Sequence, residues 1–558
     1  MVDAVAGSAE GETKPAYMRT VIAASSAGTA FEWYDFFVFG ALTSVIGKNF
    51  FSALDPTAGL LAALALFGAG FFFRPIGALI FGRLGDRVGR KAAFLITVTL
   101  MGGATFAIGL LPTYQQAGPI APILLILMRI IQGTALGGEY GGAAIYVAEH
   151  APANRRGAMT GWIQTSAAFG LVGALAAILA TRTLVGETAF TAPGWGGGWR
   201  VPFLMSAGLL AISIWMRLQL VESPSFQKLK DSGQQTKAPY SEAFGQWKNL
   251  KLVLMVLVTF MSAQGAAWYT LFFYAEQVFL ERFLKLAPAT GNLLLMAITI
   301  GSAPLYVFFA WLSDRVGRKW VMWFGMTLAL VFLLPGFHAL TSLANPALAE
   351  AQARTQVVVA ADPATCSVQF DIIGKAKFTS ACDLAKSALS NAGVSYSNEA
   401  APAGSNATVK IGAQTVASQN GAGLSADGLK TAKADLDKRL KAALTAAGYP
   451  SKADPARVNF WGLFGVLMIF VVACTALYGP MASALVEIFP TRIRYTALSL
   501  PYHIGTGWIG GFVPVSAFAI VTATGNIYSG LWYPAIFTAI SVFTLPFLLK
   551  ETAGKTLD

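Results

Sequence analysis

The sequence predicts an all-α membrane protein in which twelve helices span the bilayer as two halves of six. Three observations predict this fold class: 55% of the 558 residues are hydrophobic, only 12% are charged, and one short basic motif occurs twice. Soluble domains contain about 25% charged residues, so an ordinary soluble protein is excluded. A nucleic-acid-binding protein is also excluded, because the basic residues behind the net charge of +12 are scattered over short loops.

Apolar stretches recur that are long enough to cross the hydrocarbon core, which takes about 20 helical residues. Lys and Arg concentrate in the loops on one side of them, and the positive-inside rule makes that side cytoplasmic. Arg217, at the end of the sixth stretch, is counted among these loop residues. We therefore expect a multi-pass protein of the cell inner (plasma) membrane with both termini cytoplasmic. The predicted helices are 20–47, 58–82, 91–111, 119–149, 157–184, 199–219, 251–277, 291–312, 320–342, 457–486, 495–521 and 531–550.

Residues 343–456, called the insert below, interrupt this pattern because they are polar and contain no spanning stretch. Alternating residues at 355–361 and 407–417 predict strands, and 428–448 predicts an amphipathic helix. The insert is therefore expected to be a small α/β domain. Since it follows the ninth helix, it should lie outside the cytoplasm.

Two of the three cysteines, Cys366 and Cys382, fall in the insert. On an oxidising face of the membrane such a pair is expected to form a disulfide. Two free thiols are the alternative.

The basic motif divides the chain into repeats. Asp86–Lys91 follows the second helix, and the same six residues return as Asp314–Lys319 after the eighth. A second similarity relates "AEHAPANRRG" to "VEIFPTRIRYT", after the fourth and tenth helices. We thus expect an N-terminal half at 1–219, a cytoplasmic linker at 220–250, helices seven to nine at 251–342, the insert at 343–456 and helices ten to twelve at 457–558.

This repeated arrangement resembles the major facilitator superfamily. "GRLGDRVGRK" matches that superfamily's loop pattern G-x-L-x-D-R-x-G-R-K. "FEWYDFFVFG", "RPIGALIFG", "RIIQGTALGGEYGG" and "AEHAPANRRG" are similar to the metabolite:proton symporter family within it. Members of that family carry 2-oxoglutarate, citrate, shikimate, or proline and glycine betaine. The resemblance implies the major facilitator fold and leaves out the insert.

The repeated loops are expected to latch the two halves together on one face. Asp86 can accept hydrogen bonds from the N-terminal amides of a neighbouring helix, while Arg87 and Arg90 can pair with acids such as Glu149. Anchoring to anionic lipid is the alternative role of the arginines. The expected latch residues are Gly82, Asp86, Arg87, Arg90, Glu149, Asp314, Arg315, Arg318, Glu487 and Arg492.

Acids inside the helices are expected to be functional, because carboxylates are costly in a bilayer. Glu32 and Asp35 lie near its centre, and Arg129 can reach a similar depth. We expect Asp35 to be the main proton carrier, with Arg129 setting its proton affinity and Glu32 assisting or shaping the site. Glu139 belongs either to the proton path or to the cytoplasmic gate.

A smaller set of residues is expected to bind substrate. Arg74, which precedes a proline, should point inward and either bind a substrate carboxylate or pair with Glu139. Arg129 can also contact the substrate. In the second half, Tyr269 and His503 lie mid-helix among small residues and are the best candidates for substrate contact.

These residues predict a symporter that imports a small organic acid, such as 2-oxoglutarate or shikimate, by alternating access. A betaine- or proline-type osmolyte is the alternative substrate, and a transporter-like sensor with an outward docking domain is the alternative function. An enzyme is not expected, since H-E-x-x-H, G-x-S-x-G and metal-ligand spacings do not occur in the sequence. We expect no cofactor or metal and a monomer in the lipid bilayer; the sequence leaves proton and sodium coupling open.

Overall fold

The computed structural model describes residues 15–52, 66, 68, 70–369 and 378–557. Ten helices in this part of the chain are long and apolar enough to cross a membrane. The first and second of the twelve spans predicted from sequence are not among these ten helices. The first is the 27-residue helix α1 (Pro15–Ala41), and the second lies partly outside the described residues, which include α4 (Arg74–Arg87).

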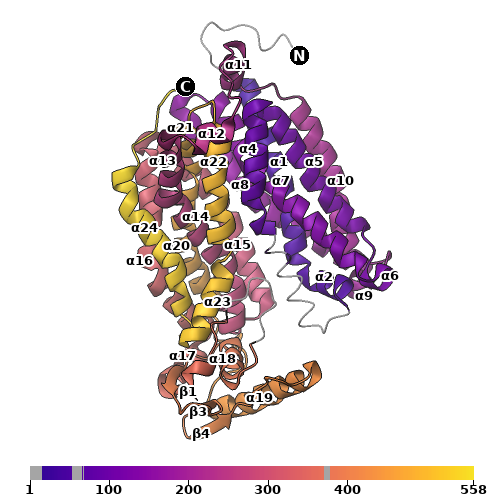
Figure 1. Ribbon diagram of the computed structural model, residues 1–558, viewed down its shortest axis with the longest axis vertical. Coiled ribbons are helices and arrows are strands. Elements are labelled where there is room, and N and C mark those ends of the chain that lie inside the picture. The colour runs from indigo at the N-terminus through magenta and orange to yellow at the C-terminus, as the bar shows by residue number, and fades with distance from the viewer. Residues whose placement is uncertain (1–14, 53–65, 67, 69, 370–377, 558) are drawn as a thin grey trace.

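The N-terminal half is a bundle of long helices with short connecting pieces (Figure 1). Its tight packing depends on glycine: a Cβ atom at Gly77 on α4 would lie 1.9 Å from the carbonyl oxygen of Thr134 on α7. Only glycine allows these two backbones to approach so closely. Besides α1 and α4, this half contains α2 (Thr43–Phe50), α5 (Arg90–Leu110), α6 (Tyr114–Ala117), α7 (Ile120–His150), α8 (Arg156–Val185), α9 (Glu187–Thr191) and α10 (Arg200–Leu218).

The linker forms two short helices, α11 (Pro224–Asp231) and α12 (Pro239–Phe244). The C-terminal half follows with α13 (Trp247–Val256), η3 (Leu257–Met261), α14 (Ser262–Tyr269), η4 (Thr270–Phe283), α15 (Pro288–Val316), α16 (Arg318–Ala344), α20 (Phe460–Tyr478), α21 (Met481–Ile488), α22 (Arg494–His503), η6 (Ile504–Gly510), α23 (Val513–Thr524), η7 (Ser529–Leu531) and α24 (Trp532–Leu548).

Three of these segments, η3, η4 and η6, are π-helical. Such wide turns are rare and are frequent at functional sites. Tyr269 is the last residue before η4, and His503 is the last before η6. The two substrate contacts expected in the C-terminal half thus stand where a helix changes its winding.

The insert is a small α/β domain made of α17 (Pro346–Arg354), β1 (Val357–Ala361), η5 (Pro363–Thr365), α18 (Ala381–Ala392), β2 (Ser397–Ala400), β3 (Thr408–Ile411), β4 (Gln414–Ala417) and α19 (Ala426–Ala446). Its strands lie in the order β2-β1-β3-β4. β1 pairs parallel with β2 and antiparallel with β3, and β3 pairs antiparallel with β4. A disulfide joins Cys366, after η5, to Cys382 in the first turn of α18.

The insert rests on the C-terminal half, beneath α23 and α16 in Figure 1. The backbone NH of Tyr396 donates to the Gly525 carbonyl at 2.7 Å, and its hydroxyl donates to the Thr522 carbonyl at 2.5 Å. Asn398 donates to the Thr524 carbonyl at 3.1 Å. The insert therefore satisfies carbonyl groups at the C-terminal end of α23, which would otherwise lack partners.

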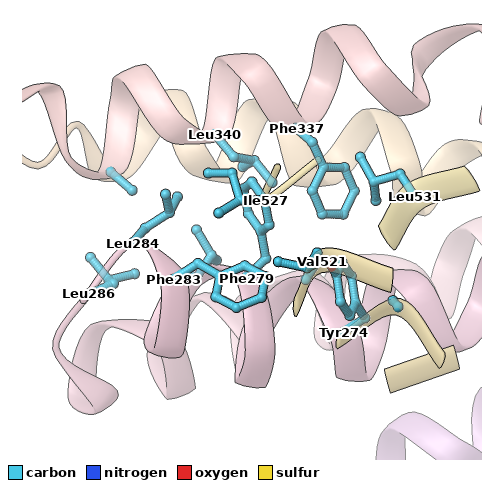
Figure 2. Close-up of a cluster of buried hydrophobic side chains, with 14 of the residues drawn as sticks. Tyr274, Phe279, Phe283, Leu284, Leu286, Phe337, Leu340, Val521, Ile527 and Leu531 are labelled. Atoms are coloured by element: carbon cyan, nitrogen blue, oxygen red, sulfur yellow. The ribbon is translucent and has the colours of Figure 1, made fainter. Parts of the chain in front are cut away.

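An apolar cluster extends from the C-terminal half into the insert, where it includes Val359 of β1; Figure 2 shows part of this cluster within the C-terminal half. Phe279 and Phe283 of η4 lie beside Phe337 of α16 and Val521 of α23. The Phe279 and Phe337 rings pack edge to face, with centroids 4.7 Å apart. Shared burial of this kind makes the insert and the C-terminal half one packed unit.

The two halves meet mainly through two helix pairs, α4 with α22 and α8 with α15, and α7 also packs against α21 and α22. We call the end of the bundle that carries Asp86–Lys91 and Asp314–Lys319 the motif end, and the opposite end the insert end. The linker helices α11 and α12 lie at the motif end, far from the insert (Figure 1).

Candidate functional site

At the motif end each half presents one aspartate to the start of a helix in the other half. Asp86 accepts hydrogen bonds from the backbone NH groups of Tyr495 (3.1 Å) and Thr496 (2.8 Å), in the first turn of α22. Asp314 accepts from the NH groups of Gly157 (2.8 Å) and Ala158 (2.7 Å), in the first turn of α8. Free amides and the helix dipole both favour an anion at such a position.

Buried arginines complete the N-terminal side of this contact. Arg90 lies 3.2 Å from Asp86 and 3.9 Å from Glu149, and Arg494 of the other half lies 2.5 Å from Glu149. Two acids and two guanidinium groups leave the cluster neutral. Neutrality offsets much of the cost of burying four charges.

The C-terminal side repeats the same arrangement. Arg318 lies 2.6 Å from Asp314 and 3.1 Å from Glu487, while Arg156 of the other half lies 2.8 Å from Glu487. The two clusters are thus related by the internal repeat. Each holds an arginine supplied by the opposite half.

Three arginines expected in the latch lie outside it. Arg87 and Arg315 are exposed, and neither forms an ion pair within the described residues. Arg315 lies over the Trp311 ring, and Arg492 pairs with Glu242 of the linker at 2.9 Å. The reason is the turn between helices: Asp86 lies in the last turn of α4 and Arg90 begins α5 across Gly89 (φ 134°), and Asp314 and Arg318 lie in the same way on either side of Gly317 (φ 107°). Each turn, which glycine permits, brings the later arginine back to the aspartate, whereas Arg87 and Arg315 precede the turn and face outward.

Arg156 and Arg494 form the ion pairs between the halves that were expected of these arginines. The sequence analysis did not predict this role for Arg156 or Arg494. Both start the helix that the opposite aspartate caps. The similarity between "AEHAPANRRG" and "VEIFPTRIRYT" contains them at matching positions, so the repeat carried a signal for their role.

The Tyr495 side chain enters the N-terminal half among glycines. Its hydroxyl donates to the Gly138 carbonyl at 2.5 Å. A Cβ atom at Gly85 would lie 1.9 Å from the Tyr495 ring, and one at Gly142 would lie 2.6 Å from its hydroxyl oxygen. At Gly82 a Cβ atom would lie 2.8 Å from the Thr496 Cα. The glycines of "GRLGDRVGRK" and of "GGEYGG" therefore make room for α22.

Asp35 is buried in the N-terminal half in a chain of polar side chains. Ser206 of α10 donates to its carboxylate at 2.5 Å, and the Thr105 side chain also contacts it. Gln132 donates to the Thr105 hydroxyl at 2.7 Å and accepts from Arg129 at 2.8 Å. Arg129 thus reaches Asp35 through two intervening side chains, without a direct ion pair.

Glu32 and Glu139 share one cation, Arg217. The same nitrogen, Nη2, lies 3.0 Å from Glu32 Oε1 and 2.8 Å from Glu139 Oε1. Thr97 donates to the second oxygen of Glu139 at 3.0 Å. Glu139 therefore pairs with Arg217 and not with Arg74; the other role expected for Arg74, binding a substrate carboxylate, stays a prediction.

Sequence reasoning missed Arg217, because we counted it as a loop residue that sets topology. In the structure only 1% of it is exposed, and its guanidinium lies 3.6 Å from the centre of the Phe94 ring. Its position inside the predicted span 199–219 was the available signal. Glu32 lacked an assigned cation, and Glu139 had only Arg74 as a candidate partner.

Arg74 lies where the two halves meet, near the bundle centre. It is 3% exposed, and its Nη1 donates to the Tyr269 hydroxyl of the C-terminal half at 3.3 Å. Its guanidinium lies 4.5 Å from the centre of the Phe71 ring and 5.3 Å from that of Phe36. Its Nε and Nη2 have no hydrogen-bond partner among the described residues.

Aromatic rings from both halves surround this cation. Tyr269 packs edge to face on Phe71 (5.4 Å) and lies 5.2 Å from Trp268, whose ring is 6.0 Å from Trp33 of α1. Tyr502 stacks on Tyr140 of the other half with centroids 3.9 Å apart.

His503, the other expected substrate contact, is buried, with its ring 4.8 Å from that of Tyr502. The rings and Arg74 form the candidate binding site. No group of three or more metal-ligating side chains occurs in the described part of the chain.

Comparison with known proteins identifies the family. The model of the family described as "Sugar (and other) transporter" matches residues 20–241, 225–357 and 442–558. The glycine betaine/proline/ectoine/pipecolic acid transporter OusA of Dickeya dadantii is 29% identical over 550 residues, which cover 97% of this chain and 85% of that protein.

Two Escherichia coli proteins are also similar. The proline/betaine transporter is 36% identical over 58% of this chain and 65% of its own length. The shikimate transporter is 34% identical over 59% of this chain and 74% of its own length.

Solved structures of the proton:xylose symporter XylE share the fold. One, bound to 6-bromo-6-deoxy-D-glucose, superposes with a TM-score of 0.61 at 16% identity and covers 98% of both chains. The chain has the major facilitator fold and belongs to the sugar (and other) transporter family of membrane transporters.

Proposed function

We propose that the protein is a proton-coupled symporter that imports a small zwitterion of the betaine or proline type by alternating access. The observation that carries this proposal is Arg74, a buried cation at the meeting point of the halves, with aromatic rings beside it and one edge, Nε and Nη2, that has no hydrogen-bond partner among the described residues. Such a site can hold a carboxylate and an ammonium group at the same time.

This edge of Arg74 suits one carboxylate. Nε and Nη2 form a side of the guanidinium fork, which can donate two parallel hydrogen bonds to a carboxylate. Nη1, on the other side, is held by Tyr269 of the C-terminal half. A bound carboxylate would therefore touch a cation that both halves position.

The aromatic rings suit a substrate ammonium group. A quaternary or secondary ammonium is attracted to the faces of Trp, Tyr and Phe rings by about 0.5–2 kcal/mol for each contact. Trp33, Phe36 and Phe71 of one half and Trp268 and Tyr269 of the other supply such rings. Two relatives named as betaine and proline transporters support this substrate class.

An organic acid, which we expected from sequence, is the second candidate. Shikimate has a single carboxylate that the same edge of Arg74 can bind, and a relative named as a shikimate transporter supports it. A dicarboxylate such as 2-oxoglutarate needs a second cation, and Arg129 is already bound to Gln132 and lies over the Phe39 ring.

Asp35 is the proton carrier in this proposal. It is 4% exposed, has hydroxyl partners and lacks a direct ion pair within the described residues, so a proton can be added without breaking a salt bridge. Arg129 stabilises its charged form through Gln132 and Thr105. The motif end then faces the cytoplasm, the insert faces outward, and the carrier works as a monomer in the inner membrane.

The experiment is uptake of radiolabelled glycine betaine, proline, shikimate and 2-oxoglutarate into proteoliposomes under an inward proton gradient. We expect glycine betaine or proline uptake that Arg74→Lys weakens by about tenfold to a hundredfold, since lysine keeps the charge but loses the two-donor edge. Trp268→Phe should retain more uptake than Trp268→Leu.

Preferential uptake of 2-oxoglutarate would contradict the zwitterion, and shikimate uptake would select the second candidate. No uptake of any of the four solutes by protein that binds one of them would favour the sensor.

A further inference from the structure

Glu32, Glu139 and Arg217, called the triad below, form a buried cluster with one more acid than cation. Glu32 and Glu139 are each 2% exposed and Arg217 is 1% exposed. Both carboxylates accept a hydrogen bond from the same guanidinium nitrogen, at 3.0 Å and 2.8 Å. Gly28 admits the arginine, since a Cβ atom there would lie 2.6 Å from Nη2.

Among the residues that the structure describes, no second cation contacts these two carboxylates. α5 contributes only the Thr97 hydroxyl and the carbonyl and ring of Phe94. The ionisable residues of α8 are Arg156 and Arg182, at its two ends. Asp86 of α4 is paired with Arg90. Two carboxylates that share one guanidinium nitrogen in a low dielectric cannot both stay charged at little cost, so the cluster is suited to taking up a proton.

The triad adjoins the contact between the halves. Tyr495 of α22 donates its hydroxyl to the carbonyl of Gly138, the residue immediately before Glu139. Its side chain also packs against Gly141 and Gly142, which follow Glu139 and Tyr140: a Cβ atom at Gly141 would lie 3.0 Å from its ring. Any shift of Glu139 therefore moves the surface that receives Tyr495.

We propose that Glu32 and Glu139 bind one proton between them, as a site separate from Asp35, and that its occupancy sets the strength of the motif-end contact through Tyr495. The inference deepens the proposed function, on which its role in transport rests. The step is a simple association: one proton from water joins the two carboxylates, and the net charge of the triad changes from minus one to zero.

The direction follows from the groups that α22 presents. Its N-terminal amides, its helix dipole and the Tyr495 hydroxyl hydrogen all bring positive charge toward the N-terminal half. A triad with net charge minus one attracts them and favours a closed motif end. Protonation removes this attraction, so the motif end opens when the proton is bound. A carrier that imports protons must open its cytoplasmic end while the proton is bound, as this response does.

The test measures the motif-end distance with spin labels at Arg87→Cys and Arg315→Cys, one in each half, by double electron–electron resonance in nanodiscs. Both positions are exposed and lie outside the ion-pair clusters. Cys474→Ala removes the one free thiol found in the described residues. The readout needs no substrate, and the ligand varied is the proton.

From alkaline to acidic buffer we expect the ratio of closed to open molecules to fall by about tenfold or more, which corresponds to a difference of about one unit in proton affinity between the two conformations. Glu139→Gln and Glu32→Gln, which mimic the protonated triad, should stay more open at alkaline pH and lose most of the response. Tyr495→Phe should weaken the response, whereas Tyr240→Phe, which breaks another tyrosine–carbonyl bond at this end, should not.

Asp35→Asn separates this inference from the proposed function. It should retain the pH response of the motif-end distance. Loss of that response in Asp35→Asn, or a normal response in both Glu139→Gln and Glu32→Gln, would assign the proton to Asp35 alone and overturn the inference, while leaving the symport proposal intact.

Discussion

Arg217 is a buried cation on which two buried acids depend. Its guanidinium is the only cation that contacts Glu32 and Glu139 in the described part of the chain. Removing one partner of a buried ion pair leaves an uncompensated charge, which typically costs about 3–5 kcal/mol. The side chain therefore supports the fold as well as the proposed proton chemistry.

We expect Arg217→Met to lower the free energy of unfolding by about 3–5 kcal/mol at neutral pH. The loss should shrink as the pH falls, because protonation removes the two uncompensated charges. Thermal unfolding of the purified protein across pH measures this. Adding Glu139→Gln to Arg217→Met should restore part of the stability; a double variant no more stable than the single one would contradict the pairing.

Asp362 in the insert gives a second pH dependence. Its carboxylate accepts from the NH groups of Gly404 (2.9 Å) and Ala364 (3.0 Å), and these hydrogen bonds lower its pKa below the usual value. A carboxyl group with a lowered pKa stabilises the fold above its ordinary pKa and loses that contribution as the pH falls through the lowered value. Protection of this turn should therefore be greatest near neutral pH.

Hydrogen–deuterium exchange of the full protein around η5, corrected for the intrinsic pH dependence of exchange, checks this expectation. Protection should fall in acid, and Asp362→Asn should show weaker protection already at neutral pH. Equal protection of the native protein and the variant at neutral pH would rule out a stabilising role for the carboxylate.

Among the elements, α22 depends on glycines of the other half. Gly85→Ala would place a Cβ atom 1.9 Å from the Tyr495 ring, in a contact that the ring cannot avoid without leaving its site. We expect this variant to disfavour the closed motif end and to reduce uptake by tenfold or more, since even a small displacement of reacting or binding groups has effects of about this size. Gly103→Ala on α5 is the matched control, because nothing lies within 4 Å of its added Cβ.

Labelling of cysteines introduced at the motif end tests whether the reduced uptake comes from a motif end that no longer closes. Gly85→Ala should expose residues there that stay protected in Gly103→Ala. Normal uptake and normal protection in Gly85→Ala would show that Tyr495 does not need this space.

The long helices could be predicted from sequence because an apolar length sufficient to span a bilayer is a local property. The alternation at 355–361 and 407–417 likewise predicted strands where β1, β3 and β4 lie, but 407–417 divides into two paired strands, and β2 was not predicted. The π-helical segments η4 and η6 were not, because a change of winding depends on packing. Tyr495 was missed because its partner, Gly138, is 357 residues away and in the other half. Arg217 was missed because helix ends are uncertain by a few residues.

At the scale of the whole molecule, the chain leaves the bundle to form the insert and returns to the bundle beside the point where it left. The NH of Asn459, where the chain returns, donates to the carbonyl of Leu343, where it leaves, at 3.0 Å. Deleting about residues 346–454 should therefore leave the bundle able to insert and to fold. Because the insert satisfies carbonyl groups at the end of α23, we expect the shortened protein to melt at a lower temperature.

Membrane fractionation and thermal unfolding test this. A milder variant, Tyr396→Phe, removes only the hydroxyl bond to Thr522 and should lower the melting temperature less than the deletion does. Failure of the deleted protein to reach the membrane, with Tyr396→Phe normal, would show that the bundle needs the insert to form.

The central claim is that Asp35 couples a proton to solute movement, and the most direct measurement compares two transport modes of Asp35→Asn. Asparagine keeps the size and can still bond to Ser206, but it cannot cycle a proton. We predict loss of accumulation driven by a pH gradient together with retained counterflow, because exchange of substrate for substrate needs no net proton movement. Full pH-driven accumulation by Asp35→Asn would contradict the account.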